Sequence, residues 1–283
     1  MISVFSGLTK LEGYTFPTYY STGAKNRAIE LSKIASSCHE YIKELYPVEI
    51  PLTLLVLNRT DSEKKNPGHM FELIRGYKNI LWYPNLKEEN AVYKEMLPYF
   101  ENGPDELKQR LRNLLPDSSN PFLTAGLNWW NTYVIHEMFH NYAPAYGVKI
   151  NLSWFDELVG DYVTYAFLKR YSDQYRVELD VSEVSFSLLY KGGHSLVQYN
   201  SIADFERLYT GVGAANYCWY HAWFNVGAFE LYKMYREEFI NEVNELYRSE
   251  SGFDSTSEQL VSRLDLELEG FKDWYDEWIK QRP

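Results

Sequence analysis

The sequence predicts an α+β protein, with a mixed sheet and a supporting helix in an N-terminal lobe and a mainly helical C-terminal lobe. Three observations predict this class. Apolar residues recur at helical spacing within residues 22–46, and Pro47 follows as a stop. Residues 50–57 then form an apolar run of strand length. After residue 121, helical patterns account for most of the remaining chain.

Composition narrows the class of protein further. The chain has 283 residues, of which 45% are apolar, so it can bury a substantial core without disulfides. Cys38 and Cys218 stand far apart, which indicates neither a disulfide framework nor a cysteine metal site. The net charge of −11 argues against nucleic acid as a partner, and no apolar run is long enough to span a membrane. The N-terminal residues do not resemble a leader peptide. We therefore expect a cytoplasmic protein, or an exported one whose leader has been removed.

Shorter elements are expected between the first helix and the second half of the chain. Residues 86–115 are charged and helical in pattern, with breaks at Pro98 and at residues 102–104. Residues 116–121 are rich in turn formers and mark the best boundary between lobes. Upstream we expect a loop and two further strands, at residues 61–68, 70–75 and 79–83. We therefore expect a single unit with two lobes, at residues 1–121 and 122–283.

The most informative stretch is His136-Glu137-Met138-Phe139-His140, inside an apolar segment with helical character. Residues four apart lie on the same face of a helix, so the imidazoles of His136 and His140 should converge on one point. Two neutral imidazole nitrogens are good ligands for zinc. Glu137 lies about a hundred degrees round the helix from His136. From there its carboxylate can act as a general base without itself binding the metal.

A second helix is predicted shortly after the motif. Pro144 should end the first helix, which leaves a tight loop at residues 143–152. Ser153 followed by Asp156 resembles a capping box, so the second helix should begin near Trp154.

This second helix carries two acidic residues four apart, Glu157 and Asp161, which share one face. Glu157 could complete a zinc site made of two histidines and one glutamate. Asp161, one turn further on, could accept the free imidazole N–H of His136 and thereby fix its tautomer. The two helices together predict Zn²⁺ as the cofactor.

The combined motif resembles the gluzincin metallopeptidases, which include the thermolysin-like and aminopeptidase-N-like enzymes. Residues 154–162 are similar to the tryptophan-led glutamate helix of the aminopeptidase branch, although the gap before Glu157 is slightly shorter. The resemblance implies a zincin-like fold with the active site in a cleft between the lobes, and a peptide or protein substrate. It also implies a substrate bound along an edge strand, and Asn79-Ile80-Leu81-Trp82 is similar to that strand of the thermolysin-like enzymes.

Towards the C-terminus, residues 190–194 predict a loop, and a long aromatic helix is expected at residues 214–246. Thr256 and Gln259 form a capping-box pattern for a last helix at residues 257–280. This last helix has an apolar stripe and is expected to be structural.

Zinc hydrolases also need a hydrogen-bond donor for the developing oxyanion. In thermolysin-like enzymes a histidine downstream of the glutamate ligand is this donor. His221 lies about as far downstream of Glu157 as that histidine lies from its glutamate. In aminopeptidase-like enzymes a tyrosine does this, so Tyr217 and then Tyr209 rank behind His221. The alternative is that His221 is one more polar residue packed among aromatic rings.

The resemblance thus implies a zinc metallopeptidase in which Glu137 moves a proton from the attacking water to the leaving amine. Two alternatives stay open. One is a zincin that acts on a modified peptide, such as a glycopeptide or a cell-wall peptide. The other is a non-catalytic zinc- or ligand-binding protein on the same scaffold. Glu137 argues against the second, because a structural zinc site needs no base and is usually closed by a fourth protein ligand.

Overall fold

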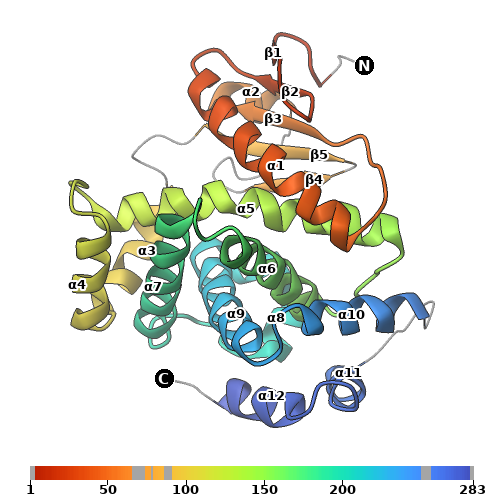
Figure 1. Ribbon diagram of the computed structural model, residues 1–283. Coiled ribbons are helices and arrows are strands. Elements are labelled where there is room, and N and C mark those ends of the chain that lie inside the picture. Colours follow the sequence, from red (N-terminus) through yellow and green to blue (C-terminus); the bar gives the residue numbers. More distant parts are fainter. Residues whose placement is uncertain (1–3, 66–73, 78, 86–90, 250–255, 281–283) are drawn as a thin grey trace. The chain divides into compact units, whose positions relative to one another are not determined.

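The computed structural model describes residues 4–65, 74–77, 79–85, 91–249 and 256–280 (Figure 1). These residues form twelve α-helices, a 3-10 helix and a five-stranded mixed sheet, which confirms the predicted α+β class. The chain divides into two compact units. The first comprises Met1–Ala91 with Leu127–Tyr146, and the second comprises Val92–Gly126 with Gly147–Pro283. The units therefore interleave along the chain, whereas the sequence analysis expected one boundary after residue 121.

The first unit contains the sheet, whose strand order is β1-β2-β3-β5-β4. Strands β2, β3 and β5 run parallel, and the outer strands β1 and β4 pair antiparallel with their neighbours. β3 is buried from Leu54 to Leu57, as expected for an inner strand with parallel neighbours. The strands are β1 (Thr9–Leu11), β2 (Thr18–Tyr20), β3 (Thr53–Leu57), β4 (Arg75–Tyr77) and β5 (Ile80–Pro84).

Two expectations about these strands need correction. The strand predicted at residues 79–83 is β5, and it lies inside the sheet rather than at its edge. The edge strand beside β5 is β4, which overlaps only the end of the strand predicted at residues 70–75. Residues 70–73 lie outside the described ranges. Gly76 of β4 pairs with Leu81 of β5. The opposite edge of β4 therefore has no neighbouring strand in the described sheet.

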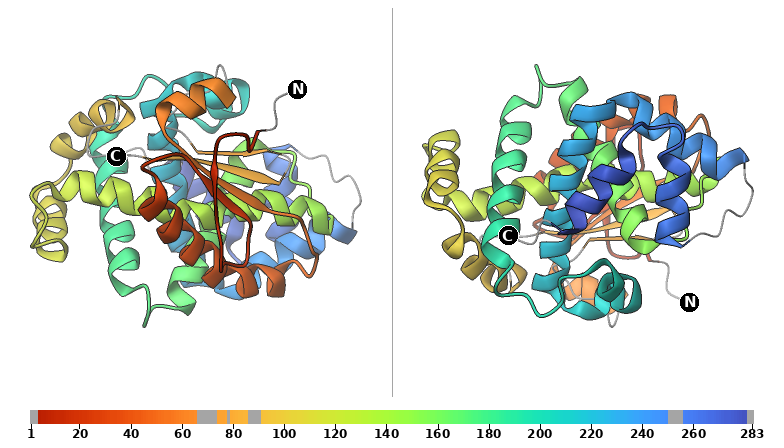
Figure 2. Two further views of the ribbon diagram at one scale, coloured as in Figure 1. Left: turned by 90° about the horizontal axis from the view of Figure 1, so that it is seen from above. Right: turned by 90° about the horizontal axis from the view of Figure 1, so that it is seen from below.

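The first predicted helix is confirmed as α1 (Lys25–Leu45), which packs against β2 and β3 (Figures 1 and 2). The predicted loop at residues 61–68 is in part a helix, α2 (Arg59–Lys65), while residues 66–68 lie outside the described ranges. The reason is a cap: the side chain of Asn58 accepts the backbone N–H of Asp61 at 2.9 Å.

The histidine motif lies in α5 (Pro121–Tyr146), which runs past the proline that was expected to end it. Pro144 removes one backbone hydrogen bond, but only two helical residues follow it. Gly147, with a φ of +102°, then ends the helix in a left-handed conformation that favours glycine. Within the first unit, α5 packs against α1, where the sulfur atoms of Cys38 and Met138 lie 3.2 Å apart.

The second unit is built around α6, α7 and α9, which pack side by side (Figure 1). Residues 190–193, predicted as a loop, belong to α7. Gly192 and Gly193 allow this helix to approach Tyr99 and Trp219 closely, so tertiary packing overrides the turn tendency of the glycine pair. The helices of this unit are α3 (Ala91–Asn102), α4 (Asp105–Leu114), α6 (Ser153–Arg170), α7 (Arg176–Gly193), α8 (Ile202–Leu208), η1 (Tyr209–Val212), α9 (Ala214–Tyr235), α10 (Glu237–Ser249), α11 (Ser257–Leu264) and α12 (Phe271–Lys280).

Three helix breaks differ from the prediction. Pro98 lies inside α3 and does not break it, whereas the break near residue 103 is present. The helix predicted at residues 214–246 is two helices, α9 and α10, because the chain turns at Arg236, whose φ is +48°. The last helix, predicted at residues 257–280, is also two, α11 and α12, although the capping box at Thr256 is present as predicted.

The C-terminal helix α12 belongs to the second unit (Figures 1 and 2), and Trp278 contacts two other helices of that unit. The centroid of its indole ring lies 4.8 Å from that of Trp223 in α9 and 5.9 Å from that of Trp154 in α6. These large rings supply much apolar area, so α12 contributes to the core, as expected for a structural closing helix. Across the described ranges, no helix combines the length and the apolar character that crossing a membrane requires.

Candidate metal centre

In the first unit, α5 brings together the two histidines of the motif. His136 and His140 are one turn apart, and their Nε2 atoms lie 2.8 Å from each other. His136 is buried, and the ring of Tyr133 stacks on it with a centroid distance of 4.2 Å. The stacked ring restricts the orientation of the His136 imidazole. Two nitrogen lone pairs can therefore be directed at one point from a single helical face.

Glu137, next to the first histidine, lies against the edge strand of the same unit. A Cβ atom at Gly76 of β4 would be 2.5 Å from Glu137 Oε2, so only glycine leaves room for this carboxylate. Asn141, one turn further along α5, donates its amide to the Glu137 carbonyl at 2.7 Å. Burial, and then the charge of Glu137, raise the pKa of Tyr83 on β5 well above its usual value, so this phenol stays protonated. The carboxylate thus lies between the motif helix and the backbone of β4.

In the second unit, α6 carries Glu157 and Asp161 one turn apart, and both carboxylates are buried. The two oxygens of Glu157 have different neighbours. Oε1 accepts hydrogen bonds from the phenols of Tyr209 and Tyr217, the latter at 3.2 Å. Oε2 lies 3.6 Å from Nε2 of His221. The carboxylate is therefore held on one oxygen and faces an imidazole with the other.

His221 itself is fully buried in α9 and lies between the two acidic residues of α6. Its Nδ1 atom is 3.2 Å from Oδ2 of Asp161, and its Nε2 atom faces Glu157. Asp161, expected from the sequence to orient His136, thus has His221 as a neighbour within its own unit. A carboxylate that accepts one imidazole N–H fixes the orientation and the tautomer of that ring.

Tyr209 reaches Glu157 from an unusual backbone conformation. It opens η1 with a φ of +46°, which non-glycine residues rarely adopt. Burial of the hydroxyl, followed by the charge of Glu157, raises the pKa of Tyr209 far above its usual value. The phenol therefore remains a hydrogen-bond donor. The residue as a whole is nevertheless 39% exposed, so it is partly accessible to solvent.

The start of α6 is positioned by a residue that the sequence analysis did not single out. The backbone N–H of Trp154 donates to Oε1 of Glu206, on α8, at 2.8 Å. Ser153 was expected to cap this helix, but it is the first helical residue, and Leu152 at the cap position makes no side-chain cap. Glu206 and Tyr209 are three residues apart, so one short segment contacts α6 both at its beginning and at Glu157. No local pattern could have indicated this, because the partners lie 52 residues apart in the chain.

Each unit thus gathers part of the predicted site. The first holds His136, Glu137 and His140 on one helix, and the second holds Glu157, Asp161, His221 and Tyr217, with Tyr209 in addition. Three of these side chains, His136, Glu157 and His221, are buried and of the kinds that could hold a metal ion.

Comparisons with known protein families, with curated proteins and with solved structures gave no match to this chain. The resemblance to gluzincins therefore depends on the motif residues alone.

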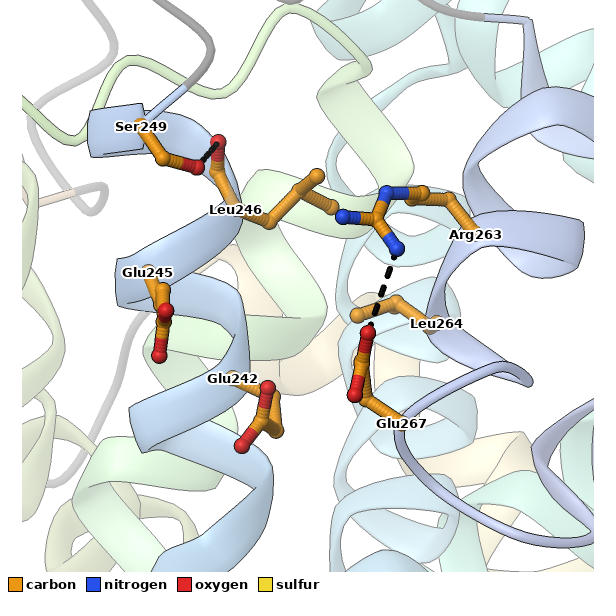
Figure 3. A pocket seen from close by; sticks show the side chains of 7 residues that line it. All are labelled: Glu242, Glu245, Leu246, Ser249, Arg263, Leu264 and Glu267. Carbon is orange, nitrogen blue, oxygen red and sulfur yellow. Dashed lines mark hydrogen bonds and ion pairs between the residues drawn. The ribbon is translucent and has the colours of Figure 1, made fainter.

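A separate pocket lies between α10 and α11 (Figure 3). Arg263 points toward Glu267 and pairs with it at 3.3 Å. Burial, together with the charges of Glu245 and Glu267, raises the pKa of Glu242. None of the predicted site residues lines this pocket, whose lining consists of Glu242, Glu245, Leu246, Ser249, Arg263, Leu264 and Glu267.

Proposed function

We propose that the protein is a zinc-dependent metallopeptidase of the gluzincin type, with the zincin-like fold that the resemblance implies. One observation carries the proposal: a single turn of α5 presents two imidazoles with converging Nε2 atoms and, next to them, the buried carboxylate of Glu137. A purely structural zinc site would need the imidazoles but not a base beside them.

The available donors fit zinc. His136, His140 and Glu157 would supply two imidazole nitrogens and one carboxylate oxygen, which is a ligand set of catalytic zinc sites. Tyr209 and Tyr217 hold the carboxylate of Glu157 through Oε1, and a carboxylate can bind a metal ion through its second oxygen. When bound, zinc would supply an activated water and polarise the carbonyl of the substrate.

Glu137 is the residue we assign as general base. Its carboxylate would take a proton from the attacking water and deliver it to the leaving amine. Its place beside Gly76 supports this role, because the backbone of edge strand β4 is then close to the group that moves the proton. A peptide substrate that pairs with an exposed strand edge is thereby brought near the base.

For the oxyanion, the contacts favour a tyrosine over His221. Tyr209 is a protonated phenol in a partly exposed residue, and its hydroxyl donates to Glu157, the proposed ligand. Tyr217 contacts the same carboxylate and is the second candidate. His221 is fully buried, with its Nδ1 on Asp161 and its Nε2 toward Glu157. A donor to the substrate must reach it, which Tyr209 satisfies best.

The proposal is tested by zinc content and proteolysis measured on the same preparations. Plasma mass spectrometry should find about one zinc per wild-type chain, most of it lost in Glu157→Ala but kept in Glu40→Ala, which changes a glutamate with an 80% exposed side chain. The wild type should cleave unmodified casein, and Glu157→Ala should not. Absence of zinc from the wild type after zinc is supplied would refute the metal site. Zinc without cleavage of casein, but with cleavage of a cell-wall peptide, would shift the substrate to modified peptides.

A further inference from the structure

We propose that His221 is itself a metal ligand, oriented by Asp161, and that it binds the same ion as Glu157. This inference rests on the proposed function, because it extends the ligand set of that zinc site. It depends only on contacts within the second unit, between α6 and α9.

The contact with Asp161 determines which ring nitrogen of His221 carries a hydrogen. Nδ1 of His221 lies 3.2 Å from Oδ2 of Asp161, and an ionised carboxylate can only accept. Nδ1 must therefore carry the hydrogen in this contact. In a neutral imidazole the other nitrogen, Nε2, then carries a lone pair that can bind a metal ion. A carboxylate that accepts the N–H of an imidazole is the usual partner of a metal-binding histidine.

Nε2 of His221 lies on the side of Glu157. Its neighbour is Oε2 of Glu157, which is also an acceptor, at 3.6 Å. A cation between two buried acceptor atoms stabilises both of them. The separation is too long for an N–H···O hydrogen bond, but it suits two ligands of one ion. With metal–ligand distances of about 2.1 Å and an angle of about 110–120°, two ligand atoms are about 3.4–3.6 Å apart.

Two acidic side chains flank the ring of His221. Glu157 and Asp161 are buried carboxylates, with residue exposures of 3% and 2%, on either side of a fully buried ring. Two carboxylates are thereby close together in an environment that solvates negative charge poorly. A divalent cation at Nε2 and Oε2 offsets both, directly at Glu157 and through the imidazole at Asp161. The ligand set of a zinc ion can expand beyond four, so His221 does not exclude a water molecule.

As a metal ligand, His221 would not be the oxyanion donor that the sequence suggested. A donor would need a hydrogen on Nε2, whereas a ligand needs the lone pair there. The two roles therefore predict opposite results for metal affinity. Loss of an oxyanion donor reduces turnover and leaves zinc in place, but loss of a ligand weakens zinc binding whether or not a substrate is present.

The test is a zinc competition titration against a chromophoric chelator, together with the visible spectrum of the cobalt(II)-substituted protein. Wild type is compared with His221→Gln, Asp161→Asn and the matched control His194→Gln, which changes a histidine at the end of α7. We expect His221→Gln to weaken zinc binding and alter the cobalt bands. Asp161→Asn should weaken zinc by about 10–100-fold, the usual effect of losing a partner that orients a ligand, and His194→Gln should change neither measurement.

The inference would be overturned if both His221→Gln and Asp161→Asn kept the zinc affinity and the cobalt bands of the wild type. The proposed function would remain intact in that case. Absence of zinc binding by the wild type would instead remove the proposed function, and the inference with it. Thermal unfolding of each variant checks that it is folded. If His221→Gln does not fold, Asp161→Asn decides the question alone, because the amide keeps the shape of the side chain.

Discussion

Tyr209 donates a hydrogen bond to Glu157 from a backbone with a φ of +46°, so a rarely adopted conformation places a phenol on the proposed glutamate ligand. Such conformations persist only where the surrounding structure enforces them, and they cluster at functional sites. Three residues before Tyr209, Glu206 of α8 accepts the backbone N–H of Trp154, so the same segment is also held at the start of α6. The arrangement supports the proposed role of the Tyr209 hydroxyl as the donor to the oxyanion.

Replacing Tyr209 with phenylalanine removes the hydroxyl and keeps the ring. If Tyr209 stabilises the oxyanion, kcat for peptide hydrolysis should fall by about 10²–10³-fold, the usual effect of losing one such donor. Zinc content should stay at the wild-type level. Tyr199→Phe serves as the control, because that hydroxyl contacts the Gln198 side chain and should not influence turnover. A larger loss in Tyr217→Phe than in Tyr209→Phe would transfer the role to Tyr217.

Gly76→Ala tests the contact between β4 and the proposed base. The added Cβ would lie 2.5 Å from Glu137 Oε2, so the carboxylate or the strand must shift. A displacement of about 1 Å at a catalytic group can cost up to about 100-fold in rate, and we expect kcat to fall within that range. Zinc content should be unchanged. Gly126→Ala is the matched control, because its new Cβ would make only an ordinary contact, at 3.7 Å from Tyr93. Equal activity of the two variants would show that Glu137 does not depend on this contact.

The sequence predicted those elements whose cause is local. The apolar stripe and Pro47 were enough for α1, and the capping box at Thr256 was enough for the start of α11. The histidine pair followed from helical spacing alone. Predictions from proline and glycine were wrong where position or tertiary packing determines the structure. Pro144 comes too near the end of its helix to break it, and Gly192 lies in a helix that packs against Tyr99.

Other parts of the site arise from contacts between distant segments. Tyr209 was only the third candidate from sequence, since nothing nearby reveals its positive φ or its partner Glu157. The pairing of Asp161 with His221 joins residues 60 apart, and a sequence pattern cannot show which of several imidazoles an acid will meet. The edge position of β4 depends on the order of strands in the sheet, which strand-like runs do not reveal.

Glu137→Gln separates the base from the metal ligands. The amide keeps the size of the side chain but cannot accept a proton from water, so hydrolysis should fall by about 10²–10⁴-fold. Zinc should remain at about one per chain, because Glu137 is not among the proposed ligands. The comparison with Glu157→Ala, which should lose zinc as well as activity, distinguishes the two glutamates. Hydrolysis at the wild-type rate in Glu137→Gln would remove this residue from the mechanism.

Glu206 provides a prediction about the pH dependence of stability. Burial raises the pKa of this carboxyl above its ordinary value, although the Trp154 N–H lowers it in part. Because the folded-state pKa is the higher one, the folded protein binds the proton more tightly than the unfolded chain. Its stabilising contribution is therefore complete below the ordinary glutamate pKa and is lost as the pH rises through the folded-state value.

Glu206→Gln should remove this dependence while the amide oxygen still accepts the Trp154 N–H. Relative to the wild type, the free energy of unfolding of the variant should rise as the pH increases from about 4 to about 7. Urea unfolding at a series of pH values measures the difference. Glu258→Gln is the control with the opposite trend, because the pKa of that exposed carboxyl is lowered by backbone and Thr256 hydrogen bonds. A difference between wild type and Glu206→Gln that stays constant with pH would show that Glu206 titrates alike in the folded and unfolded chain.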